Sequence, residues 1–243
     1  MIRVRIAWAS KGTKANKSEV AIVTDILRAS TVVTTLLAYG AEYVLPVTDV
    51  DEAIECAKKR KALLIGERNA IRIKGFDFGN SPTALSKDAI SGKPVIFSST
   101  NFPRACIAAK DASKVYIGCF LNIRCVVEHT YQYAHKNSLD ICLVLAGSKD
   151  SPDEEDLAFA ATSIDLLMDN KDVSLSDEVI KAIQWIHEVS MEKAVLNSER
   201  AKRLENLGFA EDIHFAIQKN VFPIIPFLNG LGIVRLSDIC HNC

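Results

Sequence analysis

Short apolar runs alternate with amphipathic segments over the first 145 residues of the chain. Runs rich in Val and Ile are typical of buried strands, whereas apolar residues spaced three and four apart are typical of helices. The pattern predicts strands over residues 1–9, 19–24, 43–47, 62–65, 94–98, 114–117 and 140–145. It predicts helices over residues 31–39, 49–60, 103–110 and 121–135. This alternation favours an α/β fold of three layers, α/β/α, with a largely parallel or mixed sheet covered on both faces.

The last third of the chain has a different pattern, in which helical periodicity dominates. It predicts helices over residues 157–168, 177–189, 191–207 and 210–219, a helical C-terminal elaboration of the α/β fold. Two last strands are predicted over residues 221–226 and 232–236, although Pro223 and Pro226 restrict the first to a sheet edge or a loop. No linker is evident, so we expect one domain over residues 1–243, with two lobes that divide near residues 150–176 as the alternative.

Six short polar motifs contain the residue types that carry chemistry, and five of them directly follow a predicted strand. The motifs are Asp25-Ile-Leu-Arg-Ala-Ser-Thr31, Gly66-Glu-Arg68, Gly75-Phe-Asp-Phe-Gly-Asn-Ser-Pro82, Ser99-Thr-Asn101, Gly118 to Asn122, and Ala146-Gly147 with Glu155-Asp156 beyond it. In an α/β sheet the carboxyl ends of the strands form the ligand crevice. We therefore expect the motifs to converge on one site, whose carboxylates, arginines, hydroxyls and amides suit a metal ion and a small oxyanion.

The first motif places Asp25 and Arg28 between a buried strand and a helix. Ser30 is a good N-cap for that helix, and the turn that follows contains no acidic residue to complement the positive end of the helix dipole. Arg28 and the hydroxyls of Ser30 and Thr31, beside a free helix N-terminus, suit a bound phosphate or sulfonate. The alternative is a structural cap in which Asp25 and Arg28 form an ion pair.

Glu67 and the loop that follows it offer further ligands. A glutamate at the end of a strand can bind Mg²⁺, which prefers oxygen ligands, and the alternative is a surface ion pair between Glu67 and Arg68. The connection from Glu67 to Pro82 is long, which is typical of a functional loop, and it contains Asn80 and Ser81. A structural Ω-loop is the alternative.

Two further motifs offer hydroxyl and amide groups. Thr100 and Asn101 lie just before a predicted helix, and Asn122 has the same position after the following strand. Helix capping explains these residues as well as ligand binding does, so both alternatives stay open for them.

Four acidic residues follow Pro152 within one predicted helical turn. Ser151, Pro152 and Glu154 fit a capping box with proline at the first helical position, which requires no function. Glu155 and Asp156 are left, and acids so close together repel one another unless a cation lies near. These two carboxylates are therefore candidate metal ligands.

The charge, the apolar runs and the cysteines of the sequence limit the kinds of molecule that the protein is expected to bind. The net charge is −1 with no block of like charges, which argues against a nucleic-acid surface. No apolar run approaches the ~18 residues of a membrane span, and the N-terminus lacks the apolar core of a signal peptide, so we expect a cytoplasmic protein with no membrane partner. The seven cysteines lie mostly in apolar runs, which favours buried thiols. For the lone C-x-x-C of Cys240 and Cys243, an exposed C-terminus is favoured over a metal or redox role.

Missing motifs exclude several chemistries. Cys119 and Arg124 are one residue too close for a cysteine-based phosphatase, and Leu27 stands where an aspartyl-phosphatase of the D-x-D type needs an acid. The chain has no P-loop, no G-x-G-x-x-G and no G-x-S-x-G elbow, and we expect structural roles for its five scattered histidines. The remaining chemistry is Mg²⁺ held by carboxylates, with the metal and arginine stabilising charge on a phosphoryl group.

The motifs resemble those of the 2-phosphosulfolactate phosphatase family. That family has D-x-L-R-A-[ST]-[ST], G-E-R, G-F-D-x-G-N-S-P, T-T-N-G-T-x-A and A-G with a later E-D. In the same order, this chain has Asp25 to Thr31, Gly66 to Arg68, Gly75 to Pro82, Ser99 to Ala105, and Ala146-Gly147 with Glu155-Asp156. Gly208 to Asp212 and Pro226 also resemble the end of the family's sequences. The resemblance spans most of the chain, and its first three motifs are the specific ones.

The resemblance implies an α/β/α fold and Mg²⁺-dependent hydrolysis of 2-phosphosulfolactate to sulfolactate and phosphate, a step of coenzyme M biosynthesis in some organisms. Phe102 and Pro103 stand where the family has a glycine and a hydroxyl residue. Glycine permits positive φ and close backbone approach, and phenylalanine does neither easily. We therefore expect the fit of the substrate to differ at this corner.

We predict a Mg²⁺-dependent phosphatase of a small, doubly anionic phospho-hydroxy acid. The residues expected to bind the metal or move protons are Asp25, Glu67, Asp156 and, as a fourth, Glu155. The residues expected to hold the phosphate are Arg28, Ser30, Thr31, Thr100 and Asn101. The residues expected to bind the far acid group are Arg68, Asn80 and Ser81, with Asn122 as a further substrate contact. The alternatives are a non-catalytic phosphate-ester-binding protein on the same fold, and a domain whose polar strand ends are only caps and ion pairs. The oligomeric state is left open, with a homodimer as one option.

Overall fold

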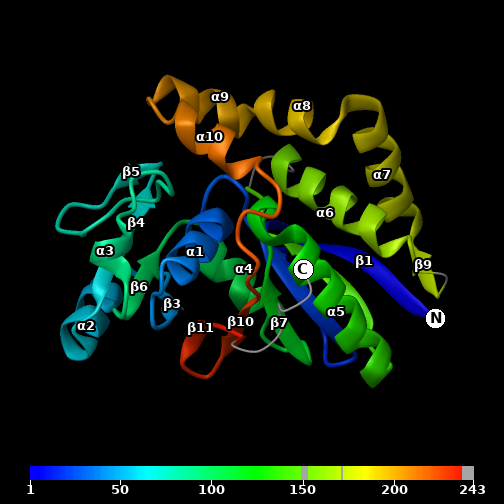
Figure 1. Cartoon of the computed structure of the whole chain (residues 1–243), viewed down its shortest axis with the longest axis horizontal. Coiled ribbons are helices and arrows are strands. Elements are labelled where there is room, and N and C mark those ends of the chain that lie inside the picture. The colour runs from blue at the N-terminus through cyan, green and yellow to red at the C-terminus, as the bar shows by residue number, and fades with distance from the viewer. Residues whose placement is uncertain (149–152, 171, 237–243) are drawn as a thin grey trace.

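The computed structural model describes residues 1–148, 153–170 and 172–236, in which strands and helices alternate as far as Leu145 and helices dominate afterwards (Figure 1). The strands are β1 (Ile2–Trp8), β2 (Glu19–Thr24), β3 (Val44–Pro46), β4 (Leu63–Arg68), β5 (Ile71–Arg72), β6 (Val95–Ser98), β7 (Lys114–Ile117), β8 (Asp140–Leu145), β9 (Val173–Leu175), β10 (Pro226–Asn229) and β11 (Gly232–Arg235). The α-helices are α1 (Ala29–Ala38), α2 (Val50–Arg60), α3 (Lys87–Ile90), α4 (Phe102–Ala109), α5 (Ile123–Asn137), α6 (Glu154–Leu167), α7 (Asp177–Val189), α8 (Met191–Leu196), α9 (Glu199–Asn206) and α10 (Ala210–Ala216).

The strands of the described residues form one mixed sheet of 11 strands, in the order β5-β4-β6-β3-β11-β10-β7-β2-β8-β1-β9. β4, β6 and β3 are parallel neighbours, and so are β7, β2, β8, β1 and β9. The antiparallel hairpin of β10 and β11 lies between these groups, so that three antiparallel pairings separate β3 from β7. The two parallel groups therefore run in opposite nominal directions.

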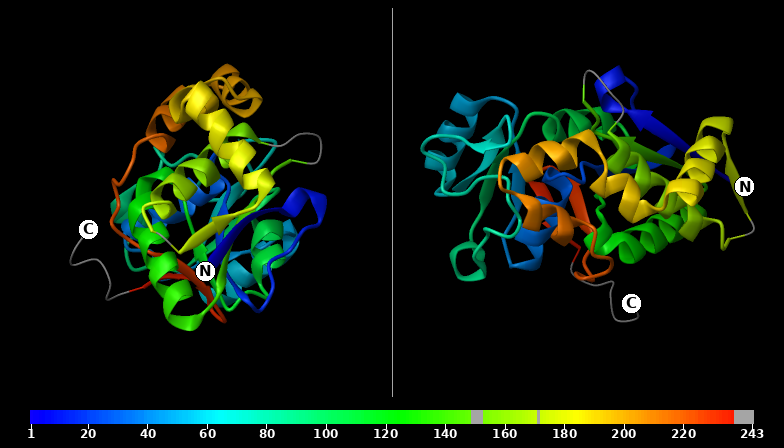
Figure 2. Two further views of the ribbon diagram at one scale, coloured as in Figure 1. Left: turned by 90° about the vertical axis from the view of Figure 1, so that its right-hand side faces the viewer. Right: turned by 90° about the horizontal axis from the view of Figure 1, so that it is seen from above.

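Helices cover both faces of the sheet, as the two views of Figure 2 show. The buried strand β2 illustrates how the sequence specifies this, because alternate side chains point to opposite faces. Val20 and Ile22 pack into the core formed with α5 and α6, whereas Ala21 and Val23 pack into the core formed with α1 and α4. A smaller core beneath α2 covers part of the β3–β6–β4 group. The three-layer α/β/α arrangement predicted from the sequence is confirmed.

The helical C-terminal elaboration is also present. α7 and α8 pack against α6, and the chain then continues through α9 and α10 across the top of the molecule in Figure 1. The last two strands return to the middle of the sheet at the opposite end of that view. How the chain divides into domains stays a prediction.

Several predicted elements have the observed bounds, including strands 19–24, 114–117 and 140–145 and helix 177–189. The single helix predicted over residues 191–207 is wrong, because it is divided into α8 and α9. Ser198 is the N-cap of α9, and its hydroxyl accepts a hydrogen bond from the amide of Ala201 at 3.1 Å. β4 continues through Arg68, so Glu67 lies within the strand and not beyond it.

For residues 221–226, which were predicted as an edge strand or a loop, the loop alternative is confirmed as far as residue 225. This segment is irregular, and β10 begins only at Pro226. β10 lies inside the sheet and not at its edge. Pro226 is compatible with this position because proline is tolerated as the first residue of a strand. The predicted cap at Ser151 and Pro152 and the Cys240–Cys243 tail lie outside the described residues.

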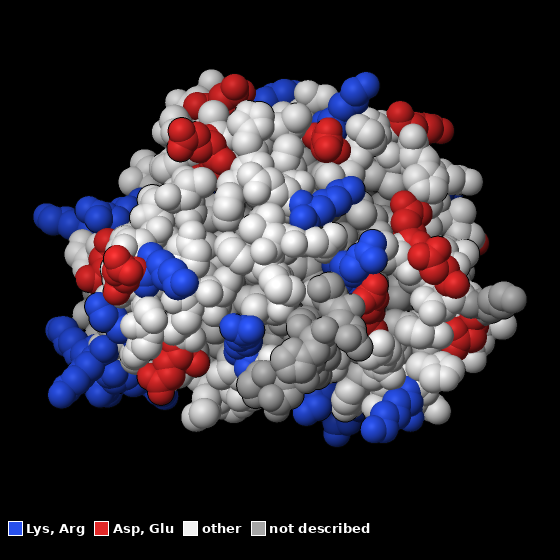
Figure 3. Space-filling model, viewed as in Figure 1, with Lys and Arg blue, Asp and Glu red and all other residues white. Residues whose placement is uncertain are grey.

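The surface carries both signs of charge. On the face drawn in Figure 3, acidic and basic side chains are interspersed, and basic ones are denser on the side of α2, whose last turn contains Lys58, Lys59 and Arg60. Among the described residues, no helix has the length and apolar character that crossing a membrane requires.

Candidate active site

The loop after β2 is closed by hydrogen bonds among its own residues. The amide of Asp25 donates to the hydroxyl of Ser30 at 3.1 Å, and the hydroxyl of Thr31 donates to the carbonyl of Ile26 at 2.8 Å. The helix α1 begins at Ala29, so Ser30 is not its N-cap and lies in its first turn. Both predicted phosphate-binding hydroxyls are therefore used to shape the loop that presents Asp25.

Arg28 leaves this loop and pairs with a distant acid. Its Nη1 lies 2.6 Å from Oδ2 of Asp212 in α10, and its Nη2 donates to the carbonyl of Ala70 at 3.0 Å. The guanidinium also lies over the ring of Phe209, 4.1 Å from the ring centre. The alternative of an ion pair between Asp25 and Arg28 is therefore contradicted.

Glu67 joins the ends of two neighbouring strands. Its Oε1 accepts hydrogen bonds from the amide and the hydroxyl of Thr100, both at 3.0 Å, and its Oε2 accepts one from the amide of Ala70 at 2.6 Å. Glu67 is buried, and Arg68 instead donates to the carbonyls of Glu67 and Thr48 and to the hydroxyl of Ser98. The alternative of a surface pair between Glu67 and Arg68 is thus contradicted as well.

A small cavity of about 30 Å³ lies where these segments meet. Its lining comes from the β2–α1 loop, the β4–β5 turn, the loop before α3, the β6–α4 loop and α9. The lining residues are Asp25, Leu27, Arg28, Glu67, Ala70, Asn80, Ser99, Thr100, Asn101, Arg200 and Leu204. Four of the six sequence motifs contribute residues to this lining. They do so although β2 belongs to one parallel group of strands and β4 and β6 belong to the other, which runs in the opposite nominal direction.

Two buried polar atoms of this lining have no hydrogen-bond partner among the described residues, Oδ1 of Asn80 and Oγ of Ser99. The residues are only 6% and 3% exposed. Buried polar atoms nearly always have a partner, so an unpaired atom in a cavity wall is what a ligand would satisfy. These two atoms give the cavity the character of a binding site.

Asp156 lies behind the cavity and not in its wall. Its Oδ1 accepts from the amide of Ile26 at 2.8 Å, and its Oδ2 accepts from the amide of Gly147 at 3.2 Å. Asp156 therefore ties the Asp25 loop to the end of β8. Neither it nor Glu155 lines the cavity, so both predicted metal ligands are placed outside it.

Arg200 of α9 lies between the cavity and a group of acids. Its Nη2 is 3.3 Å from Oδ2 of Asp153, and its Nε is 3.9 Å from Oε1 of Glu155. It also lines an adjoining acidic cavity of about 390 Å³ together with Glu199 and Trp185. Sequence inspection missed Arg200, because nothing near it in α9 distinguishes it from an exposed helical arginine.

Burial and mutual repulsion perturb the acids of the site. Burial raises the pKa of Asp25 to about 6 and that of Glu155 to about 8, and Asp153 adds to both shifts while Arg200 opposes them. Burial raises the pKa of Asp156 well above its ordinary value, and the neighbouring charges of Asp25 and Glu155 raise it further. Such perturbed groups beside a cavity are typical of functional sites.

The cavity could bind a metal ion such as Mg²⁺ only if carboxylate oxygens, an amide oxygen, water and substrate oxygens all served as ligands. Within the described part of the chain, no group of three or more His, Cys, Asp or Glu side chains is placed to hold a metal ion. Two carboxylates, Asp25 and Glu67, line the cavity together with the unpaired carbonyl oxygen of Asn80. Mg²⁺ typically binds through one or two carboxylates plus water and substrate phosphate, which this set matches.

The other predicted substrate contacts lie elsewhere. Ser81 donates to Oδ1 of Asp212 at 2.7 Å. Asn122 accepts from the amide of Cys119 and donates to the carbonyls of Ile117 and Ile224, so its side chain holds the β7–α5 connection. Ser81, Asn122 and Arg68 are not among the cavity-lining residues, whereas the predicted residues Arg28, Asn80, Thr100 and Asn101 are.

Phe102 does not line the cavity. It is completely buried, and its ring packs edge-on against Phe97 with 6.0 Å between ring centres. It occupies the first position of α4, where the backbone is helical and needs no glycine. Phe102 therefore belongs to the core, and the expected difference in substrate fit at this corner stays a prediction.

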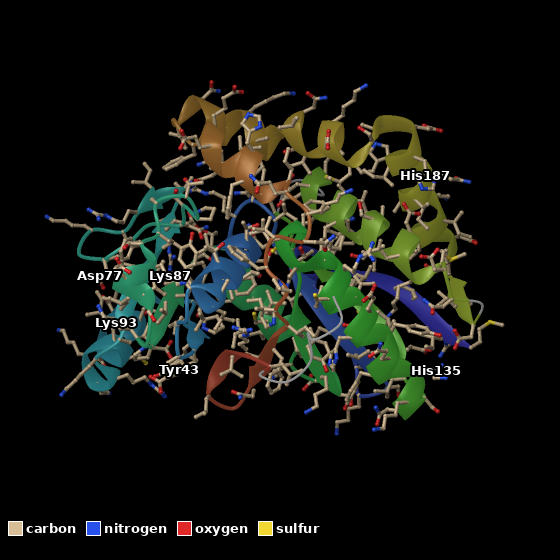
Figure 4. All side chains as sticks on the ribbon, viewed as in Figure 1. Tyr43, Asp77, Lys87, Lys93, His135 and His187 are labelled. Atoms are coloured by element: carbon tan, nitrogen blue, oxygen red, sulfur yellow. The ribbon has the colours of Figure 1, made fainter. Side chains whose placement is uncertain are left out.

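The four described histidines, at positions 129, 135, 187 and 214, do not line the cavity. His135 on α5 and His187 on α7, labelled in Figure 4, are exposed and pair with Asp172 and Asp165.

A larger cavity, about 570 Å³, lies at the amino ends of β1, β2 and β8. Its two arginines are already paired, Arg3 with Asp140 and Arg5 with Glu19. The unpaired atoms Asn80 Oδ1 and Ser99 Oγ, and the perturbed carboxyl of Asp25, belong to the smaller cavity, which we therefore take as the candidate active site.

Fold and site together define an α/β enzyme with a small buried site that combines carboxylates, guanidinium groups and unpaired polar atoms. The family model described as 2-phosphosulpholactate phosphatase matches residues 8–230 of the chain. A protein of Caldanaerobacter subterraneus subsp. tengcongensis named "Probable 2-phosphosulfolactate phosphatase" is 36% identical over 228 residues, which cover 91% of this chain and 92% of that protein.

Proteins with the same name from Clostridium perfringens and Thermotoga maritima are each 36% identical to the chain. The aligned parts cover 90% of this chain and 90% of the first protein, and 88% of this chain and 92% of the second. The chain belongs to the 2-phosphosulfolactate phosphatase family, and this membership places it among the phosphoric monoester hydrolases.

Proposed function

We propose that this protein is a Mg²⁺-dependent, cytoplasmic phosphatase that hydrolyses 2-phosphosulfolactate, or a similar small phospho-hydroxy acid, to the hydroxy acid and phosphate. With 2-phosphosulfolactate as substrate, the product is sulfolactate, and the reaction is a step towards coenzyme M. The observation that supports this proposal best is the meeting of four sequence motifs at one cavity whose wall contains unpaired polar atoms.

Arginine and hydroxyl groups of the cavity would bind the phosphoryl group. A guanidinium ion presents several N–H donors that match phosphate geometry, and the cavity has two such groups, Arg28 and Arg200. The hydroxyl of Ser99 has no partner in the described chain and would donate to a phosphoryl oxygen. By contrast, the hydroxyl of Thr100 already donates to Glu67 and would act through that carboxylate.

Asp25 is the group best placed to move a proton. It lines the cavity, and its pKa of about 6 leaves it mostly ionised at neutral pH, yet basic enough to accept a proton from an attacking water. Asp156 behind it receives two backbone amides, so it would hold the loop and not act on substrate.

Asp25, Glu67 and the carbonyl oxygen of Asn80 are the residues that would hold Mg²⁺. When bound there, the ion would act as a Lewis acid that stabilises charge developing on the phosphoryl oxygens. Arg200 and Leu204 of α9 form the part of the cavity wall contributed by the C-terminal elaboration.

The test is phosphate release from 2-phosphosulfolactate and from phospholactate, measured with Mg²⁺ and with EDTA. We expect turnover of the sulfonate that EDTA abolishes and added Mg²⁺ restores. Phosphate-ester binding by calorimetry without turnover, in a folded protein indifferent to Mg²⁺, would instead establish the non-catalytic binding protein. Absence of both binding and turnover would show that the polar strand ends are only structural.

A further inference from the structure

Asp212 is a buried acid on which three separate parts of the chain meet. Its Oδ1 accepts hydrogen bonds from the hydroxyls of Ser81 at 2.7 Å and Thr83 at 2.6 Å, and its Oδ2 pairs with Nη1 of Arg28 at 2.6 Å. The Asp212 side chain is 1% exposed and that of Arg28 is 2% exposed. α10, the loop before α3 and the β2–α1 loop are thus joined at one carboxylate.

Arg28 is held by Asp212 without using up its donors. A guanidinium has five N–H groups, and the structure assigns one to Asp212 and one to the carbonyl of Ala70. The ring of Phe209, from the turn before α10, covers one face of the guanidinium plane. No hydrogen bond from its other N–H groups to the described part of the chain is seen, so these groups would serve a ligand in the cavity that Arg28 lines.

The ion pair with Asp212 also stabilises the buried positive charge of Arg28. Burial lowers the pKa of Arg28, and the hydrogen bond and charge of Asp212 raise it. A buried guanidinium without its counter-ion would move towards water or towards another acid, because an unpaired buried charge is costly. The carboxylate of Asp212 therefore fixes where Arg28 lies in the cavity wall.

We propose that Asp212 is a positioning residue of the active site, which orients Arg28 for the phosphoryl group and makes helix α10 part of the catalytic machinery. This inference rests on the proposed function. The inference goes beyond the proposed function because it assigns a role to a residue of the C-terminal elaboration that does not itself line the cavity.

The test compares Asp212→Asn with the matched control Asp165→Asn. Asn keeps the shape and an acceptor for Ser81 and Thr83 but removes the charge that faces Arg28. Asp165 forms an exposed pair with His187 on the outer surface, so its replacement removes an ion pair of no catalytic importance. We expect Asp212→Asn to lower kcat/KM by about 10–100-fold, as the loss of an orienting partner does, and Asp165→Asn to leave kcat/KM within about twofold.

A readout other than turnover separates positioning from folding. Affinity for inorganic phosphate, measured by calorimetry on variants whose circular dichroism is that of the wild type, should weaken by about tenfold or more in Asp212→Asn. Asp212→Glu keeps the charge but moves it, and we expect intermediate values of kcat/KM and phosphate affinity. In the Arg28→Gln background, Asp212→Asn should cause no further loss, because its effect passes through Arg28.

Wild-type phosphate affinity and kcat/KM in a folded Asp212→Asn variant would overturn the inference. If that variant fails to fold, wild-type values in Asp212→Glu, or a further loss caused by Asp212→Asn in the Arg28→Gln background, would overturn it equally. If the wild type releases no phosphate from any phospho-acid, the proposed function fails, while the effect of Asp212 on phosphate affinity still decides the inference.

Discussion

The buried carboxyl of Glu155 should make the protein less stable as the pH rises. Burial raises its pKa from 4.5 to about 8, so the folded state binds a proton that the unfolded state releases. Stability is therefore undiminished below pH 4.5 and is lost progressively as the pH rises towards 8, where the folded protein ionises. With 1.36 kcal/mol for each pKa unit, the loss attributable to Glu155 between pH 5 and pH 8 is about 3 kcal/mol.

Glu155→Gln should remove this loss, because the amide occupies the same space and does not ionise. The free energy of unfolding is measured in urea, with EDTA present, at pH 5 and at pH 8. Between these two pH values it should decrease in both proteins, and the decrease should be about 3 kcal/mol smaller in Glu155→Gln than in the wild type. For a chain of this size, the corresponding gain in Tm at pH 8 is roughly 6–12 °C.

Glu154→Gln is the matched control, since Glu154 is exposed one position earlier in α6. It should leave the pH dependence of stability unchanged. If Glu155→Gln loses as much stability as the wild type between pH 5 and pH 8, the buried acid is not the source of the effect, and the reasoning from burial is refuted.

Three further predictions concern the cavity and its surroundings. Asp25→Asn should abolish most turnover with Tm within a few degrees of the wild type, because Asp25 lines the cavity and is proposed to act there on the metal or on a proton. Near-wild-type activity in Asp25→Asn would contradict its assignment. Ser99→Ala should lower kcat/KM by about 10–100-fold, the value of a hydrogen bond to a charged group, whereas an unchanged kcat/KM would remove Ser99 from the site. Phe102→Ala should lower the free energy of unfolding by about 3–5 kcal/mol and leave kcat/KM of the folded protein within about threefold of the wild type. A loss of activity without this loss of stability would show that Phe102 serves the site.

Local sequence patterns were sufficient to predict most of the fold. β2, β7 and β8 are runs of buried apolar residues with clear ends, and α7 has a regular helical period, so their bounds are as predicted. The helix predicted over residues 191–207 failed because periodicity continues across Asn197 and Ser198, and only the cap geometry shows the break. The reversal of direction between the two parallel groups depends on where the β10–β11 hairpin inserts, which no local pattern records.

Four of the six motifs converge on the cavity, whereas Gly118 to Asn122 and Ala146-Gly147, which also follow strands, do not line it. Asp25, Arg28, Glu67, Asn80, Thr100 and Asn101 meet at the cavity as expected. Glu155 and Asp156 were predicted to bind metal because adjacent acids repel one another, but burial raises the pKa of both carboxyls, which lowers their charge, and neither lines the cavity. Whether either of them binds a metal stays a prediction.

Arg200 and Asp212 were beyond prediction for a different reason. They reach the site only because α9 and α10 fold back over it. Asp212 ends the segment Gly208 to Asp212, which resembles the end of the family's sequences, and this resemblance is the sequence feature that indicates its importance.

The most direct measurement is a crystal structure determined with inorganic phosphate and Mg²⁺. We predict phosphate within hydrogen-bond distance of Arg28 and Ser99, and Mg²⁺ between the phosphate and the carboxylates of Asp25 and Glu67. Phosphate bound only in the cavity beside Arg3 and Arg5, or Mg²⁺ held by Glu155 and Asp156 away from Asp25, would contradict the placement of the active site.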